Sequence, residues 1–303
     1  MSGRISAWRD SRRSFSASQE KQHDQRIQSG MAQASAAAGG MDPRRNPAGG
    51  PRLVGYAFQW VQVTFPAKNF HNELGLTPAQ LKVALYPVNF VKNSLVGVGI
   101  LGGALSLILG ALAVGSEFGW GTVKTVYTQR PSRIQALAGQ LGMIAVITAS
   151  YSVAFFAVAA LCSWIIATID GQAATWPAAI DILKAAGASW LIFGCWSLLG
   201  MAFGYLFRQS AMAIGIGLAY LFVIEGILFR VLNGFDASWV STVEKFFAGQ
   251  NASALLGSFG RVFPSPGAAP PLVSAGEAVI VLAIYTAVFA AASALVVRAR
   301  DVT

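Results

Sequence analysis

Long apolar runs dominate the chain after residue 93, and they set the first expectation about its structure. A helix needs about 20 mostly apolar residues to cross the hydrocarbon core of a bilayer. Five stretches approach or exceed that length: 94–114, 137–169, 185–207, 211–232 and 278–297. The second is longer than one crossing requires, so it must tilt or project beyond the bilayer. The pattern therefore predicts an all-α, polytopic membrane helix bundle with five clear spans.

The first 93 residues follow a different pattern. Residues 1–50 are rich in Ser, Ala, Gln, Arg and Gly, and we expect a disordered basic tail, because such a segment cannot offset its ordering entropy. Within 51–93, the apolar run 53–65 is too short to cross a bilayer as a helix, which indicates a weak or truncated first span. A surface helix should follow it and start at Thr77-Pro78, because Thr favours the N-cap position and Pro the first turn. Residues 51–303 then form one membrane domain.

Composition indicates that lipid is part of the solvent. Of the 303 residues, 54% are hydrophobic and only 12% are charged, whereas soluble domains carry about 25% charged residues. The formal net charge of +9 fits the Lys and Arg excess of cytoplasmic loops better than it fits nucleic-acid binding. Two cysteines in apolar runs and two distant histidines offer no metal, cofactor or catalytic site, which argues against an enzyme.

The charges of the loops predict the orientation of the bundle. Three segments that share one side of the predicted spans are basic, and their cations are Lys124, Arg130, Arg133, Arg208, Arg298 and Arg300. The positive-inside rule makes this side cytoplasmic and the loop 233–276 external. Five spans would leave the basic tail outside, whereas a sixth span near residues 50–70 would bring it inside.

The segment 116–133 joins the first two clear spans and is the most informative part of the sequence. Thr122 can cap a short basic helix, and Pro131 disfavours helix at Arg130 and so ends it. A rigid helix on the cytoplasmic face is a part that a motor subunit could push. The residues alone favour this coupling helix and an ordinary basic loop equally.

The motif Glu-Phe-x-x-Gly-Thr-x-Lys-x-x-x-Thr-x-x-Pro-x-Arg at 117–133 resembles the signature of permeases of ABC-2 type transporters. A weaker match is 207–220, which resembles that family's short cytoplasmic turn and the span rich in small residues that follows it. The first match implies an ATPase-coupling role for Glu117, Gly121, Thr122, Lys124, Thr128, Arg130, Pro131 and Arg133.

This resemblance implies the permease subunit of an ATP-binding-cassette exporter in a prokaryotic plasma membrane. No Gly-x-x-x-x-Gly-Lys-Ser/Thr phosphate loop is present in the sequence, so ATP and Mg²⁺ are expected on a separate ATPase subunit. The further partners are a second permease copy or homologue and membrane lipid. The apolar interior is compatible with drugs, lipids, peptides or glycolipids as substrates.

Glu225 and Arg230 are polar residues in the fourth clear span. A carboxylate at that depth costs about 3 kcal/mol on insertion scales and usually faces a partner or a cavity. Glu225 is therefore expected either in a structural pair or in a direct transport role. The second role leads to the alternative function, a stand-alone channel or proton-coupled carrier.

Small residues recur at four-residue spacing in the spans, including Gly99, Gly103, Gly110, Gly200 and Gly204. Such faces let two helices approach closely in lipid. The pattern predicts helix packing at these glycines, and it fits contacts within one subunit as well as a seam between two.

Overall fold

The structure is a computed structural model, and it describes residues 77–119, 133–233, 238–263 and 272–299. The chain divides into two units, 1–50 and 51–303, and all described residues belong to the second. The expected basic tail, the apolar run 53–65 and most of the coupling segment lie outside the described residues. Every regular element in the described ranges is a helix, which confirms the expected all-α class.

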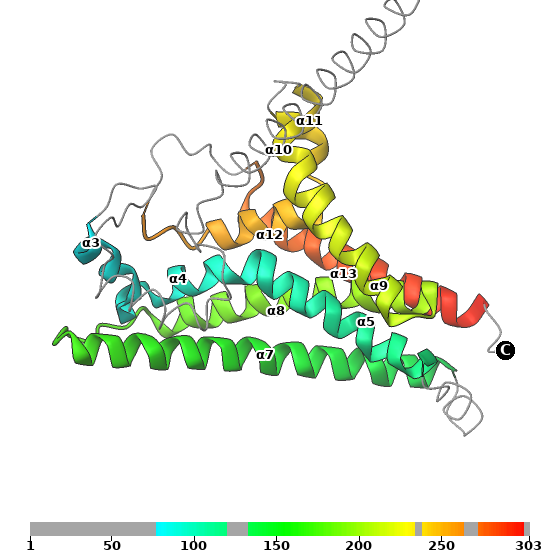
Figure 1. Ribbon diagram of the computed structural model, residues 1–303, viewed down its shortest axis with the longest axis horizontal. Helices are drawn as coiled ribbons and strands as arrows, with labels where there is room; N and C mark the ends of the chain where they lie inside the picture. The colour runs from blue at the N-terminus through cyan, green and yellow to red at the C-terminus, as the bar shows by residue number, and fades with distance from the viewer. Residues whose placement is uncertain (1–76, 120–132, 234–237, 264–271, 300–303) are drawn as a thin grey trace, which may run out of the picture. The chain divides into compact units, whose positions relative to one another are not determined.

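Figure 1 shows the arrangement of the elements. In chain order they are α3 (Pro78–Lys82), the 3₁₀ turns η1 (Val83–Leu85) and η2 (Pro87–Asn89), α4 (Phe90–Gly97), the π-helix η3 (Val98–Gly102), α5 (Gly103–Gly119), α7 (Arg133–Ile169), α8 (Ala179–Phe207), α9 (Ser210–Ala219), the π-helix η4 (Tyr220–Leu228), α10 (Phe229–Asn233), α11 (Ser238–Glu244), α12 (Ala248–Gly257) and α13 (Ala275–Ala299).

Four described helices are long and apolar enough to cross a membrane: Ile134–Ile169, Ala179–Phe207, Ser210–Leu228 and Ala275–Ala299. Large apolar side chains such as Val146 and Leu295 point away from the bundle and are 65% exposed. Apolar exposure on this scale marks a surface that another apolar phase covers, and helices of this length match a bilayer. The described chain is thus a membrane helix bundle.

The helix α8 is the centre of this bundle. It packs against α5, α7, α9 and α13 (Figure 1). In its most apolar stretch, α8 is more deeply buried than α7 or α13. α8 begins at Ala179, ahead of the expected range 185–207. Its first turns carry Asp181 and Lys184, charged residues that a hydropathy pattern leaves out of a span.

The contact between α5 and α8 depends on two glycines. A methyl group on Gly110 would overlap the carbonyl oxygen of Ser197, and one on Gly200 would overlap the carbonyl oxygen of Leu107. The Ser197 hydroxyl also donates a buried hydrogen bond of 2.9 Å to the carbonyl oxygen of Ser106. The backbones of α5 and α8 therefore touch, and a side chain at either glycine would hold them apart.

The other glycines of the predicted ladders also lie between elements of this one chain. Gly103 packs beneath the indole of Trp196, Gly204 against Val114 and Gly99 near Leu256. In this structure the five glycines thus serve packing within a subunit.

The segment after Thr77 corrects the expectation of one surface helix. The Thr77 side chain forms a capping box with Gln80, and Pro78 is the first helical residue of α3. However, Tyr86 is extended, with a ψ of 155°, because the residue before a proline disfavours helix. Pro87 therefore interrupts the segment between η1 and η2.

Polar contacts connect these short pieces to Asp170, the residue that follows the C-terminal end of α7. Lys82 Nζ lies 3.1 Å from Asp170 Oδ1, and the Tyr86 hydroxyl donates to Asp170 Oδ2 at 3.3 Å. Burial, and then the Asp170 carboxylate, raises the pKa of the Tyr86 phenol above its ordinary value of 10.0. Tyr86 therefore remains a neutral hydrogen-bond donor across the physiological range.

Gly110 and Gly200 form the contact between α5 and α8, which we call the glycine seam. Replacing either glycine should destabilise the bundle. Gly110→Ala and Gly200→Ala each force α5 and α8 apart, and overpacking of this kind costs about 1–3 kcal/mol. The measurement is thermal unfolding of the purified chain in detergent, where both variants should melt at lower temperature. Gly142→Ala in α7 is the matched control, because its methyl group meets no atom within 4 Å and alanine is the better helix former. Equal melting of all three variants would refute the seam.

Candidate functional site

The structure places the two ends of the predicted coupling segment. Glu117 lies in the last turn of α5, and Arg133 is the first residue of α7, where only its backbone is described. The remaining predicted coupling residues lie outside the described residues: Gly121, Thr122, Lys124, Thr128, Arg130 and Pro131.

Glu117 belongs to a polar cluster that joins three helices. Gln140 of α7 donates to Glu117 Oε2 at 2.9 Å, and the Tyr205 hydroxyl of α8 donates to Gln140 Oε1. The rings of Phe118 and Tyr205 meet edge to face with centroids 6.3 Å apart. We call these residues, together with Arg208, the Glu117 cluster.

Arg208 brings the second sequence motif to this cluster. It ends α8 in the left-handed conformation, with a φ of 54°, and its N–H donates to the carbonyl oxygen of Gly204 at 2.9 Å. This geometry is a common helix stop, but glycine is the usual residue there. The Arg208 guanidinium lies 6.0 Å from the centroid of the Phe118 ring, within the range of a cation–π interaction.

The end of α5 and the turn between α8 and α9 therefore meet at one end of the bundle. Gly115 of α5 faces the backbone of Ser210, the first residue of α9. The last turn of α13 shares the apolar cluster beneath, where Val297 packs with Val114, Leu137 and Tyr205. Arg298, one residue on, adds an exposed cation at the same end.

Sequence reasoning missed Gln140 and Tyr205, which connect Glu117 to its neighbouring helices. Gln140 carried a signal, since it is a polar side chain inside an otherwise apolar run. Tyr205 carried none, because an aromatic residue in a span is ordinary.

A second polar cluster surrounds Glu225 in the π-helix η4. Both carboxylate oxygens are buried and make no hydrogen bond of normal geometry to any described residue. The polar groups that face them are the Tyr220 hydroxyl and the Gly249 N–H. Cys195 of α8 and Tyr285 of α13 lie close enough to feel the charge. These five residues form the Glu225 cluster.

The π-helical conformation explains why Tyr220 and Glu225 face one another. In an α-helix, residues five apart point in different directions, whereas the i→i+5 pattern of a π-helix brings them to one face. All nine residues from Tyr220 to Leu228 adopt this conformation. Such segments are rare and often occur at functional sites.

Glu225 lies at the N-terminal end of α12. Gly249 is in the first turn of this helix, and its N-cap residue, Phe247, supplies no side-chain hydrogen bond. The first turn of a helix presents free N–H groups and a partial positive charge, which a carboxylate stabilises. The neighbour of Glu225 is therefore α12. Arg230, the other polar residue expected in this span, lies in α10 with only its backbone described.

Other hydrogen bonds hold the same end of α12 in place. The Tyr285 hydroxyl donates to the Phe246 carbonyl oxygen at 2.8 Å. The fully buried Asn251 donates from Nδ2 to the carbonyl oxygens of Lys245 and Phe247 at 2.7 and 2.8 Å. The short helix α12 is thus anchored to α13 and lies against η4.

A family model described as "Protein of unknown function (DUF2705)" matches residues 83–303. The chain belongs to the DUF2705 family. The matched region of this DUF2705 protein contains both polar clusters. No curated protein and no solved structure matches the chain.

The described part of the DUF2705 protein contains no group of three His, Cys, Asp or Glu residues that could hold a metal ion.

Removing the Tyr285 hydroxyl should loosen α12. Tyr285→Phe keeps the ring but deletes the hydrogen bond to Phe246, worth about 0.5–1.5 kcal/mol. Hydrogen–deuterium exchange of the first amides of α12 should then accelerate about 2- to 10-fold. Tyr151→Phe is the matched control, since that half-buried phenol adjoins aromatic rings. Unchanged exchange in Tyr285→Phe would contradict the anchoring role.

Proposed function

We propose that this DUF2705 protein is the permease subunit of an ATP-driven exporter whose ATPase is a separate chain. The observation that carries the proposal is the contact of Arg208 with the ring of Phe118, the residue after Glu117, at one end of the bundle. These residues belong to the two motifs that resemble ABC-2 permeases. The basic charge of this end makes it the cytoplasmic face by the positive-inside rule.

In this proposal a fifth span joins the four helices that are long and apolar enough to cross a membrane. α4, η3 and α5 follow one another without a break from Phe90 to Gly119. At about 1.5 Å per residue they are long enough to cross about 30 Å of hydrocarbon. The segment 120–132 then connects two spans on the cytoplasmic side, where an ATPase can reach it.

The contacts around Glu117 supply a route for force. A push on the coupling segment acts on α5 and α7 directly, because these helices flank it. Gln140 and Tyr205 connect both helices to α8, and the glycine seam prevents α5 from sliding independently of α8. We infer that α5, α7 and α8 move as one body against a second permease copy, as rigid-body transporters do.

Extraction of the full chain from its native membrane in mild detergent tests the partner. An ATPase subunit with a phosphate loop should co-purify, and its hydrolysis should respond to the permease. Recovery of the chain without any ATPase would count against the exporter.

Proline in the coupling segment should uncouple the two activities. Gly121→Pro and Thr122→Pro disturb the start of the proposed coupling helix, because proline lacks the N–H group and fixes φ. In proteoliposomes of the complex, we expect ATP hydrolysis to persist while export falls at least about tenfold, a loss of about 1.4 kcal/mol of coupling. Gly121→Ala and Thr122→Ser are the conservative controls and should export normally. Normal export in both proline variants would refute the coupling role.

The alternative is a stand-alone channel or proton-coupled carrier, and the Glu225 cluster is the observation that favours it. A buried carboxylate in a π-helix, without a hydrogen bond of normal geometry, is typical of an ion or proton pathway. The two functions differ in their response to Glu225→Gln, which keeps the shape of the side chain and removes its charge.

The carrier predicts transport without nucleotide that Glu225→Gln abolishes. The exporter predicts that Glu225→Gln retains ATP-dependent export, because the amide still accepts a hydrogen bond from the N-terminal end of α12. Export driven by a pH gradient alone, measured in proteoliposomes without ATP, would decide for the carrier.

A further inference from the structure

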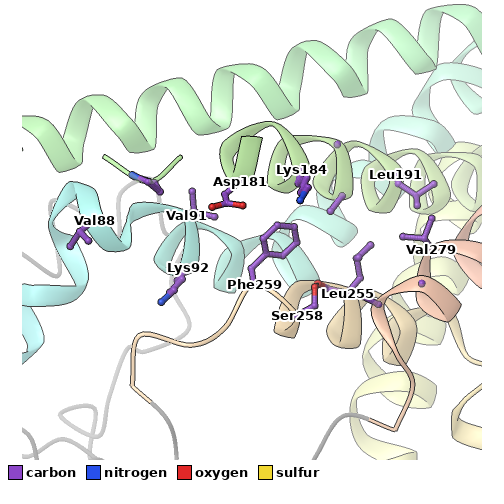
Figure 2. A pocket seen from close by; sticks show the side chains of 15 residues that line it. Val88, Val91, Lys92, Asp181, Lys184, Leu191, Leu255, Ser258, Phe259 and Val279 are labelled. Carbon is purple, nitrogen blue, oxygen red and sulfur yellow. The ribbon is translucent and has the colours of Figure 1, made fainter. Parts of the chain in front are cut away.

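A cavity of about 710 Å³ opens at the end of the bundle away from the Glu117 cluster. It lies between α4, the first half of α8, the end of α12 and the start of α13 (Figure 2). Cavities of this size hold ligands of several hundred daltons. Neither polar cluster described above contributes a residue to its lining.

The lining changes from charged to apolar along α8. Asp181 and Lys184 lie in the first turns of α8. Lys92 of α4 lines the same end of the cavity, and its ammonium group points away from the two α8 residues, toward Gly260 (Figure 2). Leu191 and Val279 line the other end. From Lys184 to Leu191 the helix advances about 10 Å, so the apolar end lies deeper along the span.

The charged end carries a positive excess. Among the described residues, the ion pair is formed by Lys82 and Asp170. Neither Lys92 nor Lys184 lies within ion-pair distance of a described carboxylate. Asp181 is the single acidic residue of the lining, and its position in the first turn of α8 suits the partial positive charge of that helix end. One anionic group is the ligand chemistry that balances two lysines and one aspartate.

We propose that this cavity binds an amphiphile with one anionic head group and one long apolar chain. The head group lies at the charged end of the cavity, which both Lys92 and Lys184 line. The chain extends along α8 toward Leu191 and Val279, where it replaces water at apolar surface. This inference is independent of the exporter, because it uses no residue of the coupling motif or of the Glu117 cluster.

Two probes that share one chain test the head group. The full-length protein in mild detergent is incubated with 1-oleoyl-lysophosphatidylglycerol, which is anionic, or with 1-oleoyl-lysophosphatidylcholine, which is zwitterionic. Native mass spectrometry then measures the fraction of protein that retains each. We expect several-fold greater retention of the anionic probe, and equal retention would overturn the proposal.

Charge variants test the two lysines. The double variant Lys92→Gln/Lys184→Gln should lower retention of the anionic probe about tenfold, as expected for two partly exposed charge contacts. Lys245→Gln is the matched control, because Lys245 is exposed and does not line the cavity. An equal loss in Lys245→Gln, or no loss in the double variant, would overturn the assignment of the head-group position.

A steric variant tests the path of the chain. Gly187 lines the cavity, and a methyl group at this position would meet no atom within 4 Å, so the side chain of Gly187→Leu projects into the space that the ligand needs. Gly194→Leu is the control. Gly194 lies two turns further along α8 and outside the lining, and a methyl group there would likewise meet no atom within 4 Å. Retention should fall in Gly187→Leu alone, and retention at the level of the unaltered protein in that variant would overturn the proposal.

The same spectra distinguish two sources of the ligand. An anionic lipid adduct present directly after extraction identifies a bilayer lipid. Protein that is free of adduct and takes up the added probe identifies a compound from outside the bilayer. Both outcomes support the site, and absence of both adducts would overturn it.

Discussion

The backbone contact between α5 and α8 is the constraint on which the described bundle depends. Gly110 and Gly200 bring two helices so close that a single methyl group on either would meet a carbonyl oxygen. In lipid there is little hydrophobic drive for helices to associate, so close packing and interhelical hydrogen bonds hold them together. The bond from Ser197 to the Ser106 carbonyl adds such a link at the same level. Because α8 also contacts α7, α9 and α13, the position of α5 against α8 sets the frame for the remaining helices.

Around that frame, polar side chains gather where helices end or depart from α-helical geometry. The Glu117 cluster lies where α5 and α8 stop, and Arg208 turns the chain into α9. The Glu225 cluster lies where a π-helix meets the first turn of α12. In both places a carboxylate that is costly to bury faces groups that offset the cost: an amide at Glu117 and the N-terminal end of a helix at Glu225.

The two ends of the bundle differ in chemistry. One end holds the Glu117 cluster with Arg208 and Arg298. The other holds the Lys82–Asp170 pair and a cavity with two lysines above an apolar wall. The contact between α5 and α8 lies between these two ends.

Composition and apolar run length by themselves determined the all-helical class and the membrane setting, because a helix in lipid must satisfy its own backbone and present apolar side chains. Capping chemistry likewise determined the start of α3 at Thr77 and Pro78, which is a local property. The partners of Glu117 and Glu225 were decided only by the tertiary structure. Gln140, Tyr205 and Gly249 are distant in sequence, and the π-helix that turns Glu225 toward Tyr220 has no sequence signal of its own. Helix formation depends on neighbours three to five residues away, whereas a polar group in the interior is satisfied by whichever helix the packing brings beside it.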